Sequence, residues 1–241
     1  MVSAALWGGL ASISLLIGAL MGIYLKIPKI YIAFIMAFGT GILIGAATFD
    51  LLLHALHESG IVLAGISFLI GALVFTIVEV MLNKKGGSDR KRSKKNPTGH
   101  SGMAIYAGTL LDAIPESIII GVSLLSNSHV NWLFVVAIFI SNLPESLSSS
   151  VGLKLDHYSN RKILGLWTSV VIVSSICSLI GYVFLKNASE QFLTSIGAFG
   201  AGALISMVCT TMLPEAFEES GPIVGFITSL GLIFSLFLTQ I

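Results

Sequence analysis

Charged residues are scarce in this sequence: Lys, Arg, Asp and Glu make up 10% of its 241 residues, against roughly 25% in a soluble domain. Hydrophobic residues account for 55%, and the mean hydropathy is +0.95. A chain of this composition cannot cover a folded surface with polar groups, which excludes a soluble enzyme, a disordered linker and a nucleic-acid-binding protein. The two cysteines, Cys177 and Cys209, lie in apolar runs, so neither a disulfide framework nor a zinc finger is expected. We therefore expect an all-α polytopic membrane protein.

Apolar runs long enough to cross a bilayer recur along the whole chain. The first has no charged residue before Lys26, and it lacks the basic region and cleavage site of a signal peptide. A membrane helix needs about 20 apolar residues. By that criterion, eight transmembrane helices are predicted in a 3+2+3 arrangement, at residues 1–25, 30–53, 61–82, 102–125, 130–153, 163–185, 191–213 and 221–241.

The charged residues divide the chain into segments and predict its orientation. Residues 1–82 hold the first three helices, 83–101 a basic loop, 102–153 the fourth and fifth helices, 154–162 a linker and 163–241 the last three helices. Basic residues collect in cytoplasmic loops. With the loop at 83–101 inside, twelve of the thirteen Lys and Arg residues are cytoplasmic, Lys186 being the exception. We expect a multi-pass protein of the cell membrane with both termini outside.

Two segments of the sequence resemble one another at a constant offset of 161 residues. Phe38–Val62 and Phe199–Ile223 share ten of 25 positions, including Phe-Gly-x-Gly at the start and Glu-Ser-Gly at the end. The first segment covers the second predicted helix and the other covers the seventh. The seventh helix comes five positions after the second, an odd number, so the two copies run in opposite directions across the membrane. Inverted repeats of this kind are typical of secondary transporters. The alternative is two similar apolar helices without common ancestry.

The fourth and fifth predicted helices both carry acidic residues in their interiors. They read Leu-Asp-Ala-Ile-Pro-Glu-Ser at 111–117 and Ile-Ser-Asn-Leu-Pro-Glu-Ser at 140–146. Asp112 and Glu116 are four residues apart and share one helix face, as do Ser141 and Glu145. Each proline frees a backbone carbonyl one turn earlier.

Burying these carboxylates in a membrane is costly. Asp112, Glu116 and Glu145 together represent about 7–10 kcal/mol on insertion scales. The predicted helix cores contain no Lys or Arg to pair with them. A divalent cation is the most economical neutralising group, and protons are the alternative. Two helices joined by protonated carboxyl groups would be the purely structural interpretation.

The 3+2+3 layout, the polar loop after the third helix and the paired x-x-x-Pro-Glu motifs resemble the ZIP family of divalent-metal transporters. Its members carry His-Asn-x-Pro-Glu-Gly in the fourth helix and His-Glu-x-Pro-Glu-Gly or a variant in the fifth. The resemblance therefore implies a metal site whose ligands are Asp112, Glu116, Ser141, Asn142 and Glu145. It also implies a divalent cation as substrate (Zn²⁺, Mn²⁺ or Fe²⁺) rather than a cofactor, no enzymatic activity, and a homodimer.

The ligand set departs from the family pattern in its chemistry. Asp112 and Ser141 stand where the family has histidines, and Ala113 replaces the asparagine. Oxygen ligands favour harder ions such as manganese or magnesium, whereas imidazole favours zinc. The sixth helix lacks the acidic ligand that members often have. We therefore expect one bound ion at a time.

Ionisable residues gather at one end of each repeated segment. Asp50, His54, His57 and Glu58 lie near the predicted outer end of the second helix. Three of them align with Glu215, Glu218 and Glu219, near the inner end of the seventh helix. We expect these groups to act as gates of the transport pathway, the alternative being solvated helix ends.

Two other function classes remain open from the residues alone. Carboxylates without other ligands would suffice for a proton- or sodium-coupled transporter of another cation. An intramembrane aspartyl protease would also need paired acids, but the sequence lacks the Gly-x-Gly-Asp signature expected of one.

Overall fold

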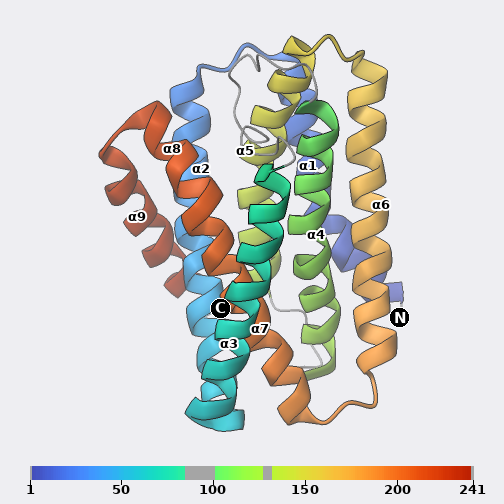
Figure 1. Ribbon diagram of the computed structural model, residues 1–241, viewed down its shortest axis with the longest axis vertical. Coiled ribbons are helices and arrows are strands. Elements are labelled where there is room, and N and C mark those ends of the chain that lie inside the picture. The colour runs from blue at the N-terminus through green and yellow to red at the C-terminus, as the bar shows by residue number, and fades with distance from the viewer. Residues whose placement is uncertain (1, 85–100, 127–131, 240–241) are drawn as a thin grey trace.

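The computed structural model describes residues 2–84, 101–126 and 132–239, and within them every regular element is a helix (Figure 1). The basic loop predicted at 83–101 lies almost entirely outside the described residues. The elements are α1 (Val2–Tyr24), α2 (Lys29–Gly45), η1 (Ala46–Leu52), α3 (Leu53–Lys84), α4 (Ser101–Ser126), α5 (Trp132–Leu155), α6 (Asn160–Leu185), α7 (Glu190–Met207), η3 (Val208–Met212), α8 (Leu213–Ser220) and α9 (Ile223–Leu238).

Six helical stretches of the described chain are long and apolar enough to cross a membrane, and α9 is a shorter apolar helix. Large hydrophobic side chains are exposed along their outer faces. On α1 they recur at Leu6, Leu10, Ile13 and Ile17, the spacing of one helical face. An apolar stripe turned away from the core suits contact with lipid. The expectation of an all-α, multi-pass membrane protein is confirmed.

The helices pack in two groups, one formed by α1, α4, α5 and α6 and the other by α2, α3, α7 and α9. α1 packs mainly against α5 and α6, and α4 packs mainly against α6. α2 packs against α9, and α3 packs against α7. A core of small and aliphatic side chains between α2, α4, α5 and α7 fills the centre of the bundle.

Local backbone features recur at the offset of the sequence repeat. The continuous helical path through α2 and α3 contains the π-helical segment η1, and the path through α7 and α8 contains η3, whose residues correspond to 47–51. Gly60 inside α3 and Gly221 after α8 both have positive φ, 75° and 68°, where glycine is favoured. Figure 1 shows the chain reversing direction near each glycine, and α2 and α7 running in opposite directions.

The paired contacts of α2 with α9 and of α7 with α3 are also alike. A Cβ on Gly41 would clash with the carbonyl oxygen of Thr228, and a Cβ on Gly202 would clash with that of Phe68. Gly41 and Gly202 are 161 residues apart. Both positions therefore need glycine because a neighbouring backbone approaches closely.

Candidate metal-transport site

Helices α4 and α5 run through Pro115 and Pro144 without a break in helical structure. The serine that follows each Pro-Glu pair donates a hydrogen bond one turn back along its own helix. Ser117 donates to the carbonyl oxygen of Ala113 at 2.6 Å, and Ser146 donates to that of Asn142 at 3.0 Å. The two acidic motifs therefore share local geometry as well as sequence.

The three acidic side chains of these helices are buried. Asp112 and Glu116 are each 2% exposed, and Glu145 is 3% exposed. Asp112, Pro115 and Glu116 line a cavity of about 10 Å³, which we call the carboxylate pocket. Its other walls come from Phe75, Ile119 and the four α7 residues Gly200, Ala203, Leu204 and Met207. Such a space is about that needed for one water molecule.

The predicted ligands of α5, Ser141, Asn142 and Glu145, are all buried. Ser141 contacts α2, because a Cβ on Gly39 would lie 3.1 Å from the Ser141 Cα. The side-chain nitrogen of Asn142 is buried and has no hydrogen-bond partner among the described residues. A half-turn of the amide about its last bond would present oxygen at that position.

The five predicted ligands do not line one common cavity. The carboxylate pocket has no α5 residue in its lining. Among the side chains that the structure describes, no group of three or more His, Cys, Asp or Glu residues is arranged to hold a metal ion. The described conformation thus brings Asp112 and Glu116 together and leaves Ser141, Asn142 and Glu145 on the neighbouring helix.

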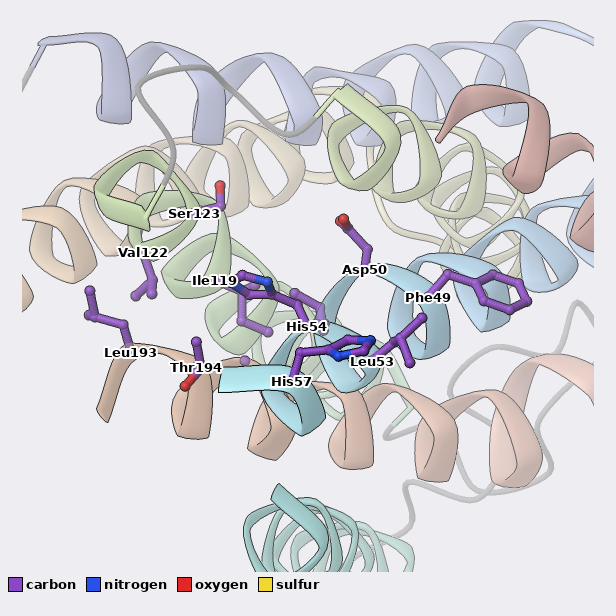
Figure 2. A pocket seen from close by; sticks show the side chains of 12 residues that line it. Phe49, Asp50, Leu53, His54, His57, Ile119, Val122, Ser123, Leu193 and Thr194 are labelled. Carbon is purple, nitrogen blue, oxygen red and sulfur yellow. The ribbon is translucent and has the colours of Figure 1, made fainter. Parts of the chain in front are cut away.

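A much larger cavity, of about 320 Å³, lies beside η1 and the first turns of α3, which carry the histidines. Asp50, His54 and His57 line this large cavity, together with α4 residues that include Ile119 and Ser123 and α7 residues that include Thr194. Figure 2 shows the imidazole rings of His54 and His57 in the space between α4 and α7. Glu58, the fourth predicted gate residue here, is exposed and is not part of the lining.

The matching end of α7 and α8 holds a cavity of about 10 Å³, which we call the closed pocket. Glu215 and Glu219 line it, whereas Glu218 is exposed and lies outside the lining. Glu219 Oε1 lies 3.6 Å from Lys29 Nζ, and the Ser148 hydroxyl donates a 2.6 Å hydrogen bond to Glu215 Oε1. These contacts join α2, α5 and α8 across the pocket.

The large cavity and the closed pocket are lined by corresponding positions. Leu193, Thr194 and Gly197 of the large cavity match Ile32, Ala33 and Met36 of the closed pocket at the offset of 161. His54 matches Glu215 at the same offset. On the acidic helices, Ile119 matches Ser148 at the offset of 29 between the two Pro-Glu motifs. Corresponding positions of the repeat therefore line both cavities, one of about 320 Å³ and the other of about 10 Å³.

Ile119 and Ser148 were not among the residues expected from the sequence. The predicted ligands are polar side chains of the two Pro-Glu motifs, and neither an isoleucine nor a serine beyond those motifs carries such a signal. Their spacing was a usable signal, because each lies three residues after the glutamate of its motif and so on the same helix face.

No family model matches the chain. The sequence is 29% identical over 181 residues to a protein of Arabidopsis thaliana described as a "putative zinc transporter". The matched region covers 73% of this chain and 29% of the relative, so the chain spans under a third of that protein's length.

Proposed function

We propose that this chain is a membrane transporter of divalent metal cations of the zinc, manganese or iron class. The observation that carries the proposal is the burial of Asp112, Glu116 and Glu145 in two apolar helices of membrane-spanning length. Buried intramembrane carboxylates are expensive and mark ion pathways. The name of the plant relative, which describes a zinc transporter, supports the same class and favours a transporter over an enzyme.

The ligand atoms suit a hard or borderline ion. Asp112, Glu116 and Glu145 offer carboxylate oxygens, Asn142 an amide oxygen and Ser141 a hydroxyl. Such a set favours manganese over zinc when compared with an imidazole site, whereas the relative's name favours zinc. We expect the ion to bind when α4 and α5 bring their acidic faces together.

Alternating access is the mechanism that the cavities support best. The large cavity at the histidine end reaches Ile119, three residues beyond Glu116 on α4, while the closed pocket at the other end is bridged by Lys29 and Glu219. Because corresponding positions line both, exchanging the conformations of the two repeats would close the first and open the second. The ion would then leave on the side of Glu215.

We propose that the chain crosses the membrane eight times. Gly60 divides the 53-residue apolar stretch Lys29–Met81 into two helices, each long enough to span. α9, with 16 residues, would form the eighth span. We further propose the orientation expected from the basic residues, with the histidine end and both termini outside the cell membrane, and a homodimeric assembly.

Uptake into proteoliposomes tests the proposal. The purified chain would be offered zinc, manganese, iron, cobalt, cadmium and magnesium separately, at two pH values, with protein-free liposomes as the control. Saturable flux of at least one of these metals is the expected result. A thermal unfolding transition would first show that the purified protein is folded. Absence of saturable flux for every metal from such protein would overturn the proposed function.

The same liposomes distinguish metal transport from proton or sodium transport. A chain that moved protons or sodium without any metal would acidify the lumen or take up sodium in metal-free buffer. A protease would instead cleave peptide substrates in detergent, which the proposal does not expect.

A further inference from the structure

One apolar side chain lies on the wall between two cavities. Ile119 is 4% exposed and lines both the large cavity and the carboxylate pocket. Among the residues that the structure describes, Ile119 alone is shared by the linings of these two cavities. Figure 2 shows Ile119 and His54 among the side chains that line the large cavity. The space reached from the histidine end therefore meets Ile119 before it meets the carboxylates.

The helix register of α4 gives this side chain its place. Asp112, Glu116, Ile119 and Ser123 follow at intervals of four, three and four residues, which is one face of a helix. Asp112 and Glu116 line the carboxylate pocket, and Ser123 lines the large cavity. A single helix face thus runs from the buried acids to the large cavity, and Ile119 is the apolar residue between them.

The side chain reaches across to the opposite wall. A Cβ on Gly200 would overlap the Cδ1 atom of Ile119, so the isoleucine packs directly on the bare backbone of α7. This aliphatic contact between α4 and α7 lies where the large cavity and the carboxylate pocket meet, because Ile119 lines both.

The corresponding position on the other side of the bundle has a different character. Ser148 occupies it on α5, and its hydroxyl bonds to the buried Glu215. A cation leaving toward the closed pocket would therefore meet oxygen atoms, whereas one entering from the large cavity meets a hydrocarbon surface. The two positions correspond in the helices, and the two ends differ in the side chain that each position carries.

We propose that Ile119 is the gate between the large cavity and the metal-binding carboxylates. The inference rests on the proposed transport function, for which it names the barrier that a cation crosses on the histidine side. Hydrophobic constrictions bar ions because they exclude the water that hydrates them. Opening requires α4 and α7 to move apart or to slide, so that Ile119 leaves Gly200.

Reactivity of a buried cysteine with Ag⁺ measures this barrier without any transport assay. Ala203 lines the carboxylate pocket beyond Ile119, so Ala203→Cys places a thiol behind the proposed gate. The native Cys177 and Cys209 are replaced by serine. Ag⁺ is added to detergent-solubilised protein, where both ends are accessible, and the thiols that remain free are counted with a maleimide after denaturation.

The expected result is slow modification when Ile119 is present and at least tenfold faster modification in Ile119→Ala. The matched control is Ile120→Ala, a deletion of the same size at a buried core residue that lines neither cavity, which should change the rate less than twofold. Thermal unfolding of each variant checks that it is folded. An unchanged rate in Ile119→Ala, or an equal rise in Ile120→Ala, would overturn the gate.

The outcomes separate the gate from the transport function. Accelerated modification in a protein that carries no metal flux would leave the barrier correct and the proposed function wrong. Metal flux together with an unchanged modification rate would leave the function standing and reject Ile119 as its gate.

Discussion

The ion pair between Lys29 and Glu219 offers a quantitative test of alternating access. It joins the start of α2 to the end of α8 over the closed pocket, with 3.6 Å between Nζ and Oε1. The two side chains are 43% and 26% exposed, so solvent screens their attraction. Exposed pairs of this kind are worth about 0.2–1 kcal/mol, which corresponds to about a 1.4- to 5-fold change in an equilibrium. Lys29→Gln should shift the balance toward the state in which this end is open by that factor.

Matched cysteines report the shift at both ends. Ile32 lines the closed pocket, and Leu193, 161 residues later, lines the large cavity. In a background without the native cysteines, Lys29→Gln should raise the rate at which Ag⁺ modifies Ile32→Cys by about 1.4- to 5-fold. Modification of Leu193→Cys should stay constant or slow down.

The charge exchange Lys29→Glu with Glu219→Lys supplies the control for this prediction. It restores opposite charges across the pocket, so the rate at Ile32→Cys should return toward the native value. An unchanged rate in Lys29→Gln, or a rise that the exchange variant keeps, would refute the idea that this ion pair holds the end closed.

Three further outcomes follow from the buried acids and the helix contacts. Glu116→Gln and Glu145→Gln should each abolish metal binding measured by calorimetry, and retained native affinity in both would exclude these carboxylates as ligands. Asp112→His should shift selectivity toward zinc in competition with manganese, because imidazole replaces an oxygen ligand; equal selectivity would contradict the ligand chemistry. Gly202→Ala should lower the free energy of unfolding by about 1–3 kcal/mol, since its Cβ meets a backbone carbonyl, while Gly225→Ala, which faces open space, should not destabilise the protein.

The sequence predicts much of the helical architecture because membrane helices are read from uninterrupted apolar length. The same reasoning treats Gly60 as a loop residue, and the structure places the chain reversal there, with positive φ. The π-helical segments η1 and η3 could not be predicted, since one extra residue per turn leaves no pattern in an apolar run.

The part of the candidate site that the sequence predicts best is its acidic residues. Carboxylates in apolar helices stand out, and Asp112, Glu116 and Glu145 are indeed buried. The sequence could not indicate that the α5 ligands would lie outside the pocket lined by Asp112 and Glu116, because helix spacing fixes a face but not the neighbour it meets. Ile119 and Ser148 could not be predicted from the sequence, because the role of each depends on which cavity its side chain lines.

The most direct test of the account is zinc and manganese flux into proteoliposomes carrying the native chain, Glu145→Gln or Glu190→Gln. Glu190 is exposed at the start of α7 and lines none of the cavities described above. The account predicts saturable flux for the native chain and for Glu190→Gln, and none for Glu145→Gln. Equal flux through all three proteins would contradict transport by way of the buried carboxylates.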